Sequence, residues 1–77
     1  MKWYVSVYDI STEALVIETP LIGVSDEAIR SAFSAPPDAL GGFPVEAATS
    51  EFVRDCTGIT VDLRRQVAFV ELLDDSD

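Results

Sequence analysis

The chain has 77 residues, no histidine, and fourteen acidic against five basic residues, which gives a formal net charge of −9. A chain of this length forms one domain and buries only about 60% of the surface that it exposes when unfolded, so a deep catalytic cavity is not expected. The charge serves solubility in any case, but it also repels phosphate backbones and attracts basic proteins. We therefore expect one domain, residues 1–77, that binds neither nucleic acid nor an anionic membrane.

The single cysteine, Cys56, excludes an intramolecular disulfide, which suits a reducing compartment. The N-terminal segment lacks the long apolar stretch and the cleavage site of a signal peptide. No segment approaches the roughly 18 consecutive apolar residues of a membrane span. These features predict a cytoplasmic protein.

The first 22 residues have the pattern of two strands joined by a short turn. Residues 2–8 alternate with the period of a strand, and residues 13–22 are rich in the side chain types that strands prefer. Asp9 and Ser11 between them can accept bonds from turn amides, which indicates an antiparallel hairpin. Pro20 lacks an amide donor and places the second strand at a sheet edge.

A first helix is predicted over residues 26–34. Ser25 is a suitable N-cap, Val24 and Ile29 have the spacing of a hydrophobic staple, and Asp26 and Arg30 can pair across one turn. The prolines after Ala35 end this helix. Residues 36–43, "PPDALGGF", lack the lysine and hydroxyl residue of a phosphate-binding loop and are predicted to be a plain connector.

A second helix is predicted from near Pro44 to a stop at Gly58. Its apolar residues fall at spacings of three and four, which indicates one buried stripe. The stripe comprises Val45, Ala48, Phe52 and Cys56. Cys56 is interpreted as a small core residue because no histidine or cationic cluster lies beside it in the sequence.

The last strand is predicted over residues 67–73, after an irregular segment at 63–66. The order is then strand, strand, helix, helix, strand. It predicts an α+β domain with a three-stranded antiparallel sheet, the first strand in the centre, and both helices on one face. Residues 74–77, "DDSD", are predicted to be a flexible acidic tail.

The alternation in the first strand separates an inward set from an outward set. The inward set is Trp3, Val5 and Val7, and the outward set is Tyr4, Ser6 and Tyr8. Tyrosines on an open sheet face have two interpretations: they pack against neighbouring strands, or they contact a partner, since tyrosine offers a large contact area at low entropic cost. The sequence leaves both interpretations open.

Catalytic and metal-binding motifs are missing from the sequence. Histidine, the commonest general base, is absent, and the serines and threonines have no adjacent base to activate them. The "DDSD" run lacks the glycine and the terminal glutamate of an EF-hand loop. We therefore expect no enzyme activity, no cofactor and no metal.

Two segments carry a resemblance to a known family. The run "WYVSVYDISTEALV" and the later "GITVDLRRQVAFVELL" are similar to the opening and closing segments of a family of short uncharacterised bacterial domains. The family usually has tyrosine or phenylalanine where this chain has Val67 and Ala68. In size, acidity and low cysteine content the chain also resembles the immunity proteins that neutralise interbacterial toxins. That resemblance implies a protein partner and carries over no individual residue.

The leading functional hypothesis is a cytoplasmic, immunity-type inhibitor that binds a basic toxin domain, such as a nuclease, and covers its cationic site. The predicted contact residues are Tyr4, Tyr8, Asp9, Glu13 and Glu18, with Asp74 and Asp75 adding long-range attraction. The alternative is a homodimeric structural or accessory domain that associates through the open face or an edge strand. Its basis is the apolar run Leu15, Val16 and Ile17.

Overall fold

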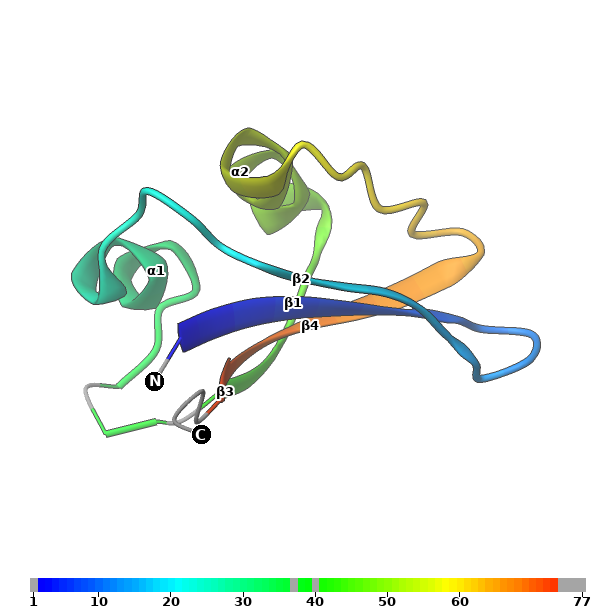
Figure 1. Ribbon diagram of the computed structural model, residues 1–77, viewed down its shortest axis with the longest axis horizontal. Coiled ribbons are helices and arrows are strands. Elements are labelled where there is room, and N and C mark those ends of the chain that lie inside the picture. The colour runs from blue at the N-terminus through cyan, green and yellow to red at the C-terminus, as the bar shows by residue number, and fades with distance from the viewer. Residues whose placement is uncertain (1, 37, 40, 74–77) are drawn as a thin grey trace.

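The protein folds into a four-stranded antiparallel sheet with two helices on one face (Figure 1). The computed structural model describes residues 2–36, 38–39 and 41–73. The elements in chain order are β1 (Lys2–Asp9), β2 (Leu15–Pro20), α1 (Asp26–Ala32), β3 (Gly41–Pro44), α2 (Ala47–Thr57) and β4 (Gln66–Leu73). The strand order is β2-β1-β4-β3. The α+β class, the two helices on one face and the position of β1 between β2 and β4 are confirmed.

The core lies between the sheet and the two helices. Val5 and Val7 of β1 are fully buried, and so are Ala68 and Val70 of β4, which lie opposite them in the antiparallel register. Trp3 is also buried, which confirms the predicted inward set of β1. The helices and loops complete this core with Leu21, Ile29, Val45, Val53 and Val61.

Helix α1 begins as predicted and ends earlier. Ser25 caps it by accepting a bond from the Ala28 amide at 3.0 Å, and Ile29 is fully buried. The predicted end at residue 34 is wrong by two residues, because Ser34 has a φ of +54°, outside the helical region. The chain therefore leaves the helix before Pro36 is reached.

Helix α2 begins at Ala47, three residues later than predicted, because Pro44 belongs to β3. It ends at Gly58, which has a φ of +78° and donates its amide to the Arg54 carbonyl at 2.7 Å. The predicted stripe is partly wrong: Ala48 is exposed, whereas Val53 is fully buried. Within the described residues, neither helix has the length and apolar character needed to cross a bilayer.

The fourth strand, β3, corrects two predictions at once. The prediction of three strands is wrong, because residues 41–44, which include the end of the predicted connector and the predicted start of the second helix, form an edge strand beside β4. Gly41 has a φ of +122°, and a Cβ at this position would lie 2.6 Å from the Glu71 Cα. Only glycine allows β3 to approach β4 so closely here, which explains why a segment with low strand propensity pairs with the sheet.

Candidate protein-interaction surface

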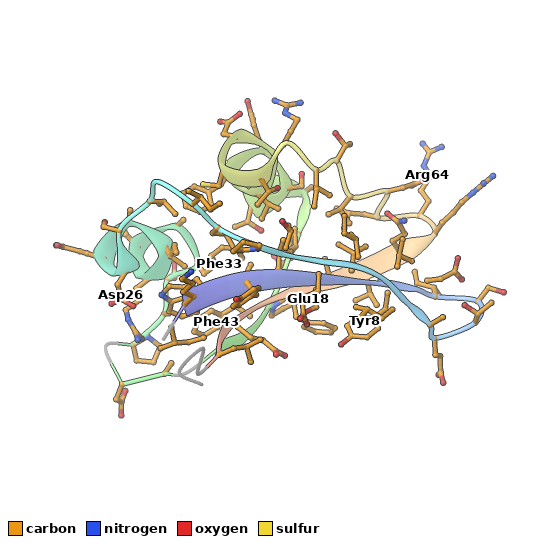
Figure 2. All side chains as sticks on the ribbon, in the orientation of Figure 1. Tyr8, Glu18, Asp26, Phe33, Phe43 and Arg64 are labelled. Carbon is orange, nitrogen blue, oxygen red and sulfur yellow. The ribbon has the colours of Figure 1, made fainter. Side chains whose placement is uncertain are left out.

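The face of the sheet that the helices leave uncovered is the candidate site. We call it the open face. Figure 2 shows Tyr8 and Glu18 on this side, away from α1 and α2. The register places Tyr4, Ser6 and Tyr8 of β1 opposite Glu71, Phe69 and Val67 of β4, and Tyr4 and Ser6 opposite Pro20 and Glu18 of β2. The open face therefore combines aromatic rings with carboxylates.

Ser6 differs from the exposed position that strand alternation predicted, because only 2% of its surface is accessible. It lies on the central strand between Phe69 and Glu18, and its small side chain is covered by these larger neighbours. Its hydroxyl donates to the Glu18 Oε2 at 3.1 Å. This bond holds Glu18 against the sheet, so one carboxylate of the open face has a fixed position.

Tyr8 and Phe69 form an aromatic pair on the open face. Their ring centroids lie 6.4 Å apart, and the ring planes meet at 62°, which is an edge-to-face arrangement. This is a diagonal cross-strand pair, since Tyr8 lies directly opposite Val67. Both rings are only half-buried. The tyrosine thus packs across strands, as the first interpretation predicts, and its half-buried ring leaves contact with a partner as a prediction.

A pocket of about 630 Å³ lies beside this pair. Its size falls in the range of about 300–1,000 Å³ that is typical of ligand sites. Its lining comprises Tyr8, Asp9, Ile10, Glu13, Gly42, Val67, Phe69 and Glu71. The lining contains three carboxylates and no basic side chain. Such a pocket favours a positively charged group that also carries apolar surface.

The turn between β1 and β2 fixes the carboxylate of Asp9 and the backbone of Glu13. Asp9 accepts bonds at one oxygen from the amides of Ser11, at 2.8 Å, and Thr12, at 3.0 Å, which confirms its predicted turn role. Glu13 has a φ of +62°, a conformation that residues other than glycine rarely adopt. The Glu13 amide donates to the Asp9 carbonyl at 2.8 Å, and this hydrogen bond joins the two ends of the turn.

The structure brings some of the predicted contact residues together and not others. Tyr8, Asp9 and Glu13 line the pocket, whereas Tyr4 and Glu18 lie on the same face outside it. Asp74 and Asp75 lie outside the described residues. Sequence reasoning missed Phe69 and Glu71, which line the pocket from β4. They alternate along β4 with Ala68 and Val70, which the structure buries, but the nearly continuous apolar run "VAFVELL" hides this alternation in the sequence.

The helix-covered face has its own aromatic cluster, which is already occupied by internal contacts. Phe33 lies 6.1 Å from Phe43 and 6.2 Å from Phe52, and Phe43 lies 5.9 Å from Trp3 between ring centroids. The Trp3 Nε1 donates to Asp26 at 2.8 Å. These rings contact one another and the core, so they are structural residues.

Asp26 and Arg30 connect helix α1 to this cluster. The Arg30 Nε donates to Asp26 at 2.8 Å, and its guanidinium lies 5.3 Å from the centre of the Trp3 ring. The hydrogen bond from Arg30, followed by that from Trp3, lowers the pKa of Asp26 from its ordinary value. The charge of Arg30 is therefore neutralised within the domain by Asp26, which confirms the predicted Asp26–Arg30 pairing.

Cys56 is half-buried and packs against the core, in line with its interpretation as a small apolar residue. Burial, and secondly the charge of Asp55, raise the pKa of its thiol. A raised pKa lowers the fraction of reactive thiolate at neutral pH. The surroundings of this thiol thus oppose nucleophilic reactivity.

Fold and surface together define a small α+β domain with a helix-covered core face and an acidic, aromatic open face. Residues 2–71 match the family described as Domain of unknown function (DUF7683), and the chain belongs to this family. The resemblance to an uncharacterised domain family is thereby confirmed. Searches of curated proteins and of solved structures give no significant match.

Proposed function

We propose that this protein is a cytoplasmic, immunity-type inhibitor that binds a basic toxin domain through its open face. The observation that supports the proposal best is the pocket beside Tyr8 and Phe69, which contains three carboxylates and no basic residue. Within the described residues, no ion pair engages Asp9, Glu13 or Glu71. Their charge is therefore available to a partner.

Inhibition would follow from occupying the partner's cationic surface. A toxin that cleaves nucleic acid needs basic residues to bind phosphate, and these residues are the natural counterparts of the carboxylates on the open face. Tyr8 and Phe69 would supply apolar contact area, and the net charge of −9 would accelerate encounter with the basic partner. No catalytic step by this chain is required.

Co-purification from the cells that produce the protein tests the proposal. The wild type, Glu71→Lys and Asp55→Lys are compared by quantitative mass spectrometry at low and moderate salt. The last two changes alter the net charge equally, but Asp55 is exposed on α2, in the helix layer (Figure 1). The proposal predicts one basic protein in one-to-one stoichiometry, lost with Glu71→Lys and retained with Asp55→Lys. Its retention with both variants, or the absence of any basic partner, would refute the proposal.

The exposed apolar residues of β2 favour one alternative, a homodimer formed along this edge. Leu15, Val16 and Ile17 are 52%, 53% and 41% exposed, and an edge strand offers unpaired backbone groups to a second strand. Sedimentation over a wide concentration range tests this alternative. It requires a dimer that Val16→Asp dissociates, whereas a monomer at every concentration removes it.

A further inference from the structure

The pocket beside Tyr8 and Phe69 has the chemistry of a site for one particular side chain. Its aromatic part comes from both strands of the sheet centre, Tyr8 from β1 and Phe69 from β4, and Val67 adds an aliphatic surface. Rings with accessible faces attract cations through their quadrupole, by about 0.5–1 kcal/mol at exposed sites. The floor of the pocket therefore suits a cation that is flat, weakly hydrated, or both.

The carboxylates lie at separate points around this floor. Asp9 comes from the end of β1, Glu13 from the β1–β2 turn, and Glu71 from β4, next to the tight approach of Gly41. Among the described residues, which include the whole lining of the pocket, no three acidic, histidine or cysteine side chains are grouped closely enough to hold a metal ion. A cation with several spaced hydrogen-bond donors meets such carboxylates better than a single metal ion does.

We propose that this pocket binds an arginine side chain of the partner protein, and this inference rests on the proposed function. A guanidinium has five N–H donors in one plane, stacks on aromatic rings and is less strongly hydrated than an ammonium group. It can lie against Tyr8 or Phe69 while donating to carboxylates on different sides. The volume of about 630 Å³ leaves room for the aliphatic stem and the adjoining backbone.

Two-dimensional NMR titration of the purified protein with N-acetylarginine amide tests the inference. N-acetylcitrulline amide, which has nearly the same shape without the charge, and N-acetyllysine amide are the matched controls. We expect saturable shifts of the Tyr8 and Phe69 ring signals with the arginine probe, weaker binding of the lysine probe, and none of the citrulline probe. Equal binding of arginine and citrulline probes, equal binding of arginine and lysine probes, or shifts confined to other surfaces would overturn it.

Single-residue variants test which side chains of the pocket bind the arginine probe. Phe69→Leu keeps an apolar side chain and should weaken binding of the arginine probe about two- to fivefold, since it removes one cation–π partner. Glu71→Gln should also weaken it, whereas Glu51→Gln on α2 should have no effect. The amide spectrum of each variant shows whether the fold is kept. An unchanged affinity in a folded Phe69→Leu protein would contradict the proposed site.

The outcomes separate this inference from the function on which it rests. If the arginine probe does not bind while the partner still depends on Glu71, the inhibitor function stands and the arginine site is wrong. If the probe binds as expected but no basic partner is found in the cells, the pocket chemistry stands and the inhibitor function fails.

Discussion

Both faces of the sheet carry aromatic and charged side chains. On one face these side chains are paired within the domain, and on the other they remain accessible. On the helix-covered face, the rings of Trp3, Phe33 and Phe43 contact one another, and the Arg30 cation is paired with Asp26. On the open face, Tyr8 and Phe69 contact each other but remain half-buried, and the nearby carboxylates have no ion-pair partner among the described residues. The difference separates residues that hold the fold together from residues available for binding.

The largest expected effect comes from breaking the covered face. Ile29→Ala removes a fully buried side chain and should lower the free energy of unfolding by about 2–5 kcal/mol, since such changes lose transfer energy and leave a cavity. Tyr8→Leu on the open face keeps much of the apolar side chain and should cost only about 0.5–1.5 kcal/mol, the worth of an aromatic pair beyond its burial. Urea unfolding of both variants measures the contrast. Equal losses would mean that the open face is a second core.

The next effect concerns the strand that borders the pocket. Gly41→Ala places a Cβ 2.6 Å from the Glu71 backbone, in addition to the strain of a positive φ, and should cost more than roughly 1–3 kcal/mol. Gly42→Ala is the control, since it also has a positive φ but meets no atom within 4 Å. Urea unfolding should show Gly41→Ala as clearly the less stable variant. Similar stabilities would show that close approach to β4 is not the reason for this glycine.

A smaller effect is expected from acid on the covered face. Because the pKa of Asp26 is lowered in the folded protein, the unfolded chain takes up this proton first as the pH falls. The stability that Asp26 contributes is therefore present above its ordinary pKa of about 3.9 and is lost as the pH falls through the lowered value. The thermal unfolding temperatures of the wild type and Asp26→Asn should approach each other as the pH falls below about 4, which is close to the ordinary pKa of aspartate. A gap that widens with acid would contradict this sign.

The smallest effect is expected at the turn. Glu13 has a φ of +62°, which costs a residue with a Cβ about 1–2 kcal/mol relative to glycine. Glu13→Gly should therefore be more stable than Glu13→Ala, while both lack the same carboxylate of the pocket. Urea unfolding orders the two variants, and binding of the arginine probe should fall in both. If Glu13→Gly bound the probe as the wild type does, this carboxylate would have no role in the pocket.

Much of the fold follows from local patterns in the sequence. The inward set of β1, the Ser25 cap and the Gly58 stop each depend on residues close together in the chain, and the structure has all three. Strand β3 does not follow from such a pattern. Its glycines have a positive φ and no side chain, so its position depends on contacts with β4 that residues 41–44 do not encode alone.

The candidate site could be predicted only on the side of the first strand and its turn. Tyr8, Asp9 and Glu13 are close in sequence, and the strand and turn patterns together predict them as contact residues. The sequence does not indicate Phe69 as a residue of this site, because "VAFVELL" is almost continuously apolar and its largest side chain would be assigned to the core. The structure buries the smaller Ala68 and Val70 instead, because these two side chains belong to the core between the sheet and the helices.

We infer that the open face, and not the overall charge, binds a basic partner. The most direct test is the association rate constant of the purified partner with the wild type, Glu71→Lys and Asp55→Lys, measured by stopped flow at two salt concentrations. Both variants change the net charge equally, so steering by total charge would slow them equally. We expect a fast, salt-sensitive association rate that falls much further with Glu71→Lys than with Asp55→Lys. Equal slowing in the two variants, or a rate indifferent to salt, would contradict it.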